Sequence, residues 1–156
     1  LDAKTGCRHW TFQARHGIRA AVSVGPYRSA ARSGMAVYFA DLDAVAYAVD
    51  ADTGREIWSR DVDDHTYASS TGSPTLHDGR LYVTAAAVGE EGQGGRAQYE
   101  CCTFRGSLTA LDANTGAVVW KSYTITEPPT PRGSNSRPRR KSPRSSTVRS
   151  AASLGE

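Results

Sequence analysis

Apolar and polar residues alternate over short runs along most of the chain, which is the period of β-strands. These runs lie at 35–39, 44–49, 55–60, 73–76 and 80–84. Asp78-Gly79 separates the last two runs and predicts a tight hairpin turn. Little helical periodicity is present, so the pattern predicts an all-β fold made of short antiparallel strands.

A ten-residue pattern occurs three times, beginning at Leu1, Val49 and Leu111. Asp, Thr, Gly and Trp hold identical offsets in the three copies, which are 48 and then 62 residues apart. A period near 50 residues is typical of a solenoid or a propeller. Four short strands for each repeat favour the propeller, whose blades are four-stranded antiparallel sheets.

The residues of each copy suit a tight turn followed by a docking surface. In the second copy, Asp50 can accept backbone N–H groups and Gly54 can supply the positive φ that such a turn requires. Trp58 then offers a large flat surface for burial against a neighbour. Because an isolated blade cannot bury both of its faces, each repeat is expected to pack on the next.

Charge divides the 156-residue chain into two parts, which we predict as propeller repeats over 1–126 and a basic tail over 127–156. The first part has 12 Lys+Arg and 14 Asp+Glu, and the tail has 7 Lys+Arg and 2 Glu. The repeats therefore have no basic face that would favour nucleic acid. The longest apolar stretch, 81–88, is too short for a membrane span.

The tail is rich in Ser, Arg and Pro and is expected to be disordered. Three interpretations remain open: a solvated tail, an electrostatic anchor for nucleic acid or anionic lipid, and a frameshift near residue 130 that ends the propeller pattern early.

The repeat resembles that of the quinoprotein dehydrogenases, eight-bladed propellers built around pyrroloquinoline quinone (PQQ). Their motif Ala-x-Asp-x-x-Thr-Gly-x-x-x-Trp runs here from Ala48 to Trp58 and from Ala110 to Trp120. Segments 62–65, 71–83 and 101–107 look like the polyvinyl-alcohol dehydrogenase branch. The resemblance implies a partial propeller of about two and a half of eight blades. A non-catalytic outer-membrane assembly lipoprotein uses similar blades as a scaffold.

The resemblance also implies cofactor contacts. Cys101 and Cys102 would form a vicinal disulfide that packs on the quinone plane, although two thiols in a packed loop remain an alternative. Arg105 would bind a quinone carboxylate through its planar fork, or lie on a blade surface. Thr71 would hydrogen-bond the cofactor, or simply precede a strand.

Calcium is the second implied cofactor, because family members coordinate it through a Glu at the end of the strand that matches 81–88. Glu90 and Glu91 are the candidate ligands, and a solvated acidic turn is the alternative. His65 is either a site residue or part of a solvated turn. Cys7 is expected to be a small buried apolar residue.

The implied function is that of a fragment of a PQQ-dependent alcohol dehydrogenase, with an alcohol substrate, a cytochrome c acceptor and a periplasmic location. The family's catalytic Asp comes from a later blade and no residue here matches it, so the chain alone is expected to be inactive. Two open blade edges would be exposed, and poor solubility is expected. The alternative function is a propeller scaffold that binds protein partners and no cofactor.

Overall fold

The computed structural model describes residues 1–30, 32–93 and 101–129. Within these residues the fold is all-β apart from one short 3-10 helix, as the alternation predicts. The elements are β1 (Ser23–Arg28), β2 (Ser33–Ala40), β3 (Val45–Asp50), β4 (Glu56–Asp61), β5 (Ala68–Ser69), β6 (Thr75–His77), β7 (Arg80–Ala87), η1 (Glu90–Gln93), β8 (Ser107–Asp112) and β9 (Val118–Tyr123).

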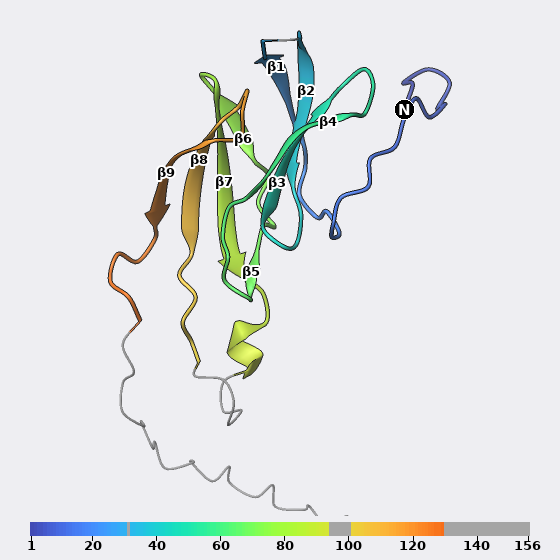
Figure 1. Ribbon diagram of the computed structural model, residues 1–156. Coiled ribbons are helices and arrows are strands. Elements are labelled where there is room, and N and C mark those ends of the chain that lie inside the picture. Colours follow the sequence, from blue (N-terminus) through green and yellow to red (C-terminus); the bar gives the residue numbers. More distant parts are fainter. Residues whose placement is uncertain (31, 94–100, 130–156) are drawn as a thin grey trace, which may run out of the picture.

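The strands form two antiparallel sheets that lie side by side (Figure 1). In the first sheet the order is β1-β2-β3-β4, a simple meander. In the second sheet β5 and β6 both pair with β7, which is followed by β8 and β9. Each sheet is therefore four strands wide, and the predicted four-stranded antiparallel blades of a partial propeller are confirmed.

The main hydrophobic core lies between the two sheets. Tyr38 and Trp58 from the first sheet join Leu81 and Leu111 from the second sheet in one buried cluster. A smaller cluster on the other face of the first sheet contains Tyr47, whose ring stacks on a neighbour in the same sheet. Burial of these side chains is the dominant stabilising term in holding blade to blade.

The three repeat turns have the same geometry. Oδ1 of Asp50 accepts the backbone N–H groups of Asp52 and Thr53 and the hydroxyl of Thr53. The Asp residues at the same position of the first and third copies make matching bonds. Gly54 has a φ of 72°, and its counterparts Gly6 and Gly116 have 71° and 69°. The turn predicted from the repeat is confirmed in each copy.

Two of the repeat tryptophans lie on the turn of the following repeat. Trp10 donates its Nε1–H to the carbonyl of Ala51 at 2.9 Å, and Trp58 donates to Ala113 at 3.0 Å. A Cβ placed on Gly54 would lie 2.7 Å from the Trp10 ring, and one on Gly116 would lie 2.7 Å from the Trp58 ring. Glycine is therefore needed both for the turn and for the indole that covers it.

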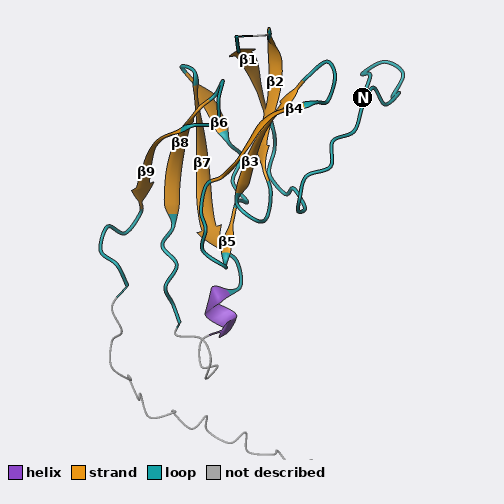
Figure 2. Cartoon of the chain, viewed as in Figure 1, coloured by secondary structure: helices purple, strands orange, loops and turns teal. Residues whose placement is uncertain are grey.

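The connections gather at two opposite ends of the sheets (Figure 2). We call one the turn end; it comprises residues 29–30, 32, 51–54, 78–79 and 113–116. We call the other the loop end; it comprises residues 11–22, 41–44, 62–67, 88–93 and 101–106, whereas residues 70–74 join β5 to β6 alongside β7. The ends match between the sheets, since the Ser70 N–H donates to the Asp41 carbonyl at the loop end and the Arg28 N–H donates to Asn114 at the turn end.

The predictions for Cys7 and for the basic tail have different outcomes. Cys7 is exposed rather than buried, because it follows the first repeat turn without a covering strand. In the predicted tail, residues 127–129 are exposed and 130–156 lie outside the described residues, so the prediction of disorder stays a prediction. The described residues include no helix of the length and apolarity that membrane crossing would demand.

Candidate functional site

Most of the residues that the sequence singled out gather at the loop end, whereas Thr71 lies between β5 and β6. Thr71 precedes β6, Glu90 opens η1, and Cys101, Cys102 and Arg105 lie on the segment that enters β8. This segment and η1 belong to the long connection between β7 and β8. The second blade thus supplies most of the candidate site.

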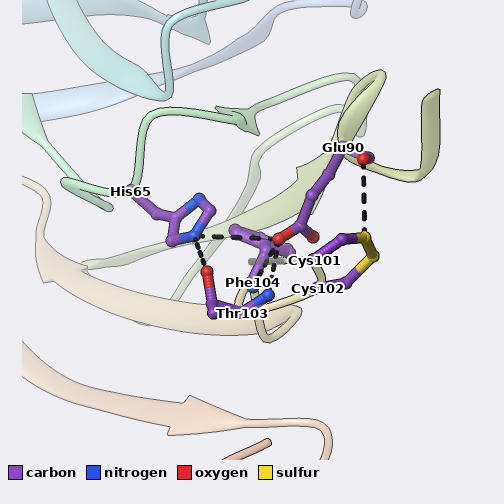
Figure 3. Close-up of a disulfide and its surroundings, with 6 residues drawn as sticks. All are labelled: His65, Glu90, Cys101, Cys102, Thr103 and Phe104. Carbon is purple, nitrogen blue, oxygen red and sulfur yellow. Dashed lines mark hydrogen bonds and ion pairs between the residues drawn. A yellow bond between two sulfur atoms is a disulfide. The ribbon is translucent and has the colours of Figure 1, made fainter. Parts of the chain in front are cut away.

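Cys101 and Cys102 form a disulfide between adjacent residues (Figure 3). The peptide bond that joins them is cis. Cys101 is half-buried and Cys102 is exposed, so the small ring presents one side to solvent at the loop end. The thiol alternative is therefore wrong for this structure.

Glu90 fixes the chain immediately after the disulfide. Its side chain is buried, and Oε1 accepts the backbone N–H groups of Thr103 at 2.6 Å and Phe104 at 3.0 Å. Its own carbonyl oxygen lies 3.7 Å from the sulfur of Cys101 (Figure 3). A solvated acidic turn is thus wrong for Glu90, because the following loop folds back over its carboxylate. The side chain of Glu91 lies outside the described residues.

His65 holds the same segment from the neighbouring connection. Its Nε2 lies 2.9 Å from Oγ1 of Thr103 and 3.9 Å from Oε1 of Glu90. Its ring meets the ring of Phe104 edge-on at 5.3 Å. Because Nδ1 accepts the backbone N–H of Tyr67, a neutral ring carries its proton on Nε2 and donates it toward Thr103. The alternative of a fully solvated turn is wrong for His65.

Asp63 connects the His65 loop to the outer strand β9. Its Oδ2 accepts from Lys121 Nζ at 2.6 Å and from the Ser107 hydroxyl at 3.2 Å, and its Oδ1 accepts the His65 N–H. Burial raises the pKa of Asp63, but the hydrogen bonds from Lys121, His65 and Ser107 outweigh it and leave the pKa below its ordinary value. The carboxylate therefore stays ionised and braces the loop.

Arg105 and Thr71 lie apart from this cluster. The Arg105 guanidinium stacks over the ring of Tyr123 at 3.8 Å and donates to the carbonyl of Thr126 at 2.9 Å. Thr71 is exposed beside β6. Among the described residues, no hydrogen bond joins either side chain to Glu90 or to the disulfide. The structure brings Glu90 and the cysteines together and leaves Arg105 and Thr71 outside these contacts.

The donor atoms limit what the site can hold. The described part of the chain contains no group of three or more His, Cys, Asp or Glu residues placed to bind a metal ion. Glu90 supplies one buried carboxylate, and one of its oxygens already accepts two N–H groups. Among the described residues, Glu90 would therefore supply calcium with one ligand, and further ligands would be needed to complete a site.

His65, Thr103, Phe104 and Lys121 complete the cluster and were not predicted as a unit. His65 was a candidate only because it follows two Asp residues. Thr103 and Phe104 lie in the segment 101–107 that carries the resemblance, but no role was predicted for them or for Lys121. Thr103 contacts His65 across 38 residues and Lys121 contacts Asp63 across 58 residues, so no local signal points to these contacts.

The family model described as outer membrane protein assembly factor BamB (PQQ_2) matches residues 1–148. A polyvinylalcohol dehydrogenase of Pseudomonas sp is 42% identical over 131 residues, which are 84% of this chain and 20% of that enzyme. A quinoprotein ethanol dehydrogenase of Pseudomonas putida is 35% identical over 127 residues, which are 77% of this chain and 19% of that enzyme.

Among solved structures, a europium-containing methanol dehydrogenase matches with a TM-score of 0.46 and 28% identity, over 64% of this chain and 15% of that one. The chain spans about a fifth of the length of the curated relatives that it matches. The two blades, their repeat turns and the family match agree. The chain therefore belongs to the PQQ_2 family of propeller proteins, and quinoprotein alcohol dehydrogenases are among its relatives.

Proposed function

We propose that this chain supplies two blades of a PQQ-dependent alcohol dehydrogenase and that its loop end forms part of the quinone site. The observation that carries the proposal is the disulfide of Cys101 and Cys102, held by Glu90 at the loop end of the second blade. The 42% identity to a polyvinylalcohol dehydrogenase supports the same assignment.

The residues present suit a flat, anionic ring system. The disulfide offers a compact, polarisable face, and Glu90 and His65 restrict the segment that carries it. Arg105 lies three residues beyond Cys102, and its planar fork, which stacks over Tyr123 and donates to Thr126, is of the kind that binds a carboxylate. Thr71 contributes an exposed hydroxyl from the connection between β5 and β6 of the same blade. Bound PQQ would supply the oxidising power, accepting two electrons as an alcohol becomes a carbonyl compound.

The proposal also includes a calcium ion, to which this chain would supply only some of the ligands. Glu90, with Glu91 beside it, would offer carboxylate oxygen to the ion, and other ligands would come from outside the described residues. The interaction of Glu90 Oε1 with two backbone N–H groups supports a carboxylate that is fixed in direction.

The rest of the proposal concerns the whole enzyme. Its substrate is an alcohol of the polyvinyl-alcohol type, and its electrons pass to a cytochrome c. A periplasmic location agrees with the disulfide, because such bonds persist in oxidising compartments. The chain alone lacks a residue for the base that takes the alcohol proton, so we expect it to bind quinone and not to oxidise alcohol.

Binding of PQQ to the oxidised 156-residue chain tests the proposal, measured by equilibrium dialysis. The double variant Cys101→Ser/Cys102→Ser should bind at least about tenfold more weakly, since the packing face is lost. Cys7→Ser is the matched control, because Cys7 is exposed and follows the first repeat turn, outside the candidate site. No binding by the wild-type chain, or equal binding by the double variant, would contradict the proposal.

A non-catalytic scaffold is the second candidate. The description of the matching family, an outer membrane protein assembly factor, favours it. A scaffold would show no quinone binding in the same dialysis experiment, so one measurement separates the two functions.

A further inference from the structure

The segment that carries the disulfide, residues 101–105, enters β8 without being part of a strand. Side chains from elsewhere in the fold hold it in place. Glu90 accepts the backbone N–H groups of Thr103 and Phe104, which fixes the path of the backbone. The Thr103 hydroxyl and the Phe104 ring both meet His65, which lies on the connection between β4 and β5 (Figure 3). The segment is thus held by two different connections.

The backbone of His65 is itself fixed by a buried carboxylate. Its N–H donates to Oδ1 of Asp63 at 3.1 Å. Oδ2 of the same carboxylate accepts from Nζ of Lys121, on β9, at 2.6 Å. The side chain of Asp63 is only 6% exposed, so this ion pair is largely shielded from solvent. His65 therefore starts from a backbone position that is tied to the second sheet.

The two ring nitrogens of His65 have different partners. Nδ1 accepts the backbone N–H of Tyr67 at 3.2 Å, so the neutral ring carries its proton on Nε2. Nε2 lies 2.9 Å from Oγ1 of Thr103. The bond from Tyr67 therefore selects the form of the ring that donates to Thr103.

The position of Thr103 governs the orientation of the disulfide, because Thr103 directly follows Cys102. On the other side of Thr103, the ring of Phe104 packs against the main hydrophobic core. With Thr103 tied to His65 and Phe104 tied to the core, the exposed side of the disulfide has one orientation. A flat ligand then meets a surface that is already formed, so that little of the binding free energy is lost in ordering the segment.

We propose that His65 is a positioning residue for the quinone. Through its Nε2–H and the Thr103 hydroxyl, it holds the disulfide in the orientation on which the flat ring system packs. The inference rests on the proposed function and deepens it, since His65 acts on cofactor affinity through Thr103 rather than through a contact of its own. Asp63 and Lys121 fix the backbone from which His65 acts.

Two substitutions separate the roles of the two ring nitrogens. In His65→Gln the amide nitrogen can take the place of Nε2 and keep the donation to Thr103. In His65→Asn the amide oxygen can take the place of Nδ1 and keep the bond from Tyr67, but no donor reaches Thr103. Both variants lose the ring, so the lost contact with Phe104 is common to them and cancels in the comparison.

Equilibrium dialysis of the 156-residue chain with PQQ measures the effect on affinity. His65→Asn should raise the Kd about three- to tenfold relative to His65→Gln, which corresponds to the loss of one hydrogen bond. Thr103→Val should also raise the Kd. The double variant His65→Asn/Thr103→Val should bind no more weakly than His65→Asn alone, because both changes remove the same bond. Urea unfolding should give equal global stability for the Asn and Gln variants.

Hydrogen exchange without PQQ separates this inference from the proposed function. The amides of Thr103 and Phe104 should exchange about three- to tenfold faster in His65→Asn than in His65→Gln. If the wild-type chain binds no PQQ, the proposed function fails, and the exchange comparison alone decides whether His65 positions the segment. Equal exchange in the two variants would overturn the inference. Equal PQQ affinities of the two variants would also overturn it where the wild-type chain binds.

Discussion

The two blades share a strand plan and differ in the connection at their loop end. In the first blade, residues 41–44 join β2 to β3, and in the second blade residues 88–106 join β7 to β8. Each connection is organised by one buried carboxylate, Asp41 or Glu90. Oδ1 of Asp41 accepts the N–H groups of Asp43 and Val45.

The two carboxylates have different structural roles because the connections that they organise differ in length. Asp41 closes a short turn and also accepts the Tyr47 hydroxyl, so it ties that turn to the first sheet. Glu90 holds a long segment that brings the disulfide to the surface. The blade repeat thus supplies a stable frame, and the candidate functional residues lie in the longer connection.

The largest predicted effect comes from removing the contact between the blades. Trp58→Ala should lower the free energy of unfolding by about 3–5 kcal/mol, because it leaves a cavity between the sheets and removes one of the two hydrogen bonds to the Ala113 carbonyl. Urea unfolding of dilute protein measures this. Trp120→Ala is the matched control and should cost far less, since Trp120 has no such contact within the described residues. Equal losses would mean that Trp58 does not join the blades.

Asp41→Ala should have the next largest effect, a loss of about 3 kcal/mol in unfolding free energy. The substitution leaves buried donors at Val45 and Tyr47 without their acceptor. Asp43→Ala, an exposed neighbour, should change stability by less than about 0.5 kcal/mol. Loss of the first blade's cooperative transition would be visible by circular dichroism. A cost no greater than that of the control would show that the short connection needs no carboxylate.

Glu90→Ala should act locally rather than on the whole fold. The N–H groups of Thr103 and Phe104 lose their acceptor, so local opening should become easier by about 1–3 kcal/mol. Hydrogen exchange at these two amides measures the change, and amides of the first sheet should keep their protection. Glu56→Ala is the exposed control. Unchanged exchange at Thr103 and Phe104 would remove Glu90 as the residue that positions the disulfide segment.

The smallest predicted effect is at the turn end and appears only in acid. A hydrogen bond from Thr53, with others from Tyr27 and the backbone, lowers the pKa of Asp50 from 3.8 to about 2. Since the folded pKa is the lower one, this stabilisation is present above about pH 4 and is lost as the pH falls toward 2.

Asp50→Asn should therefore flatten the dependence of stability on pH between about 4 and 2. Thr53→Val should flatten it in part, because it removes the largest cause of the shift. Urea titrations at a series of pH values give the slope. The same slope in wild type and Asp50→Asn would rule out this carboxylate as the source of the acid sensitivity.

The repeat made the fold predictable, while the site was predictable only in part. The turn and the docking surface could be predicted from Asp50, Gly54 and Trp58, because these residues recur at fixed spacing and each has a local structural role. The adjacent residues Cys101 and Cys102 could likewise be recognised in the sequence as a candidate disulfide. The contacts of Glu90 with Thr103 and of His65 with the same residue depend on how two long connections fold together, and no local periodicity encodes that.

Under the proposed function, the quinone binds at the loop end and not at the turn end. The most direct measurement is a map of backbone amide shifts on adding PQQ to the isotope-labelled chain. We predict shifts in residues 62–71 and 101–106, with the turns at 51–54 and 113–116 unchanged. Shifts confined to those turns, or none at all at saturating PQQ, would contradict the account.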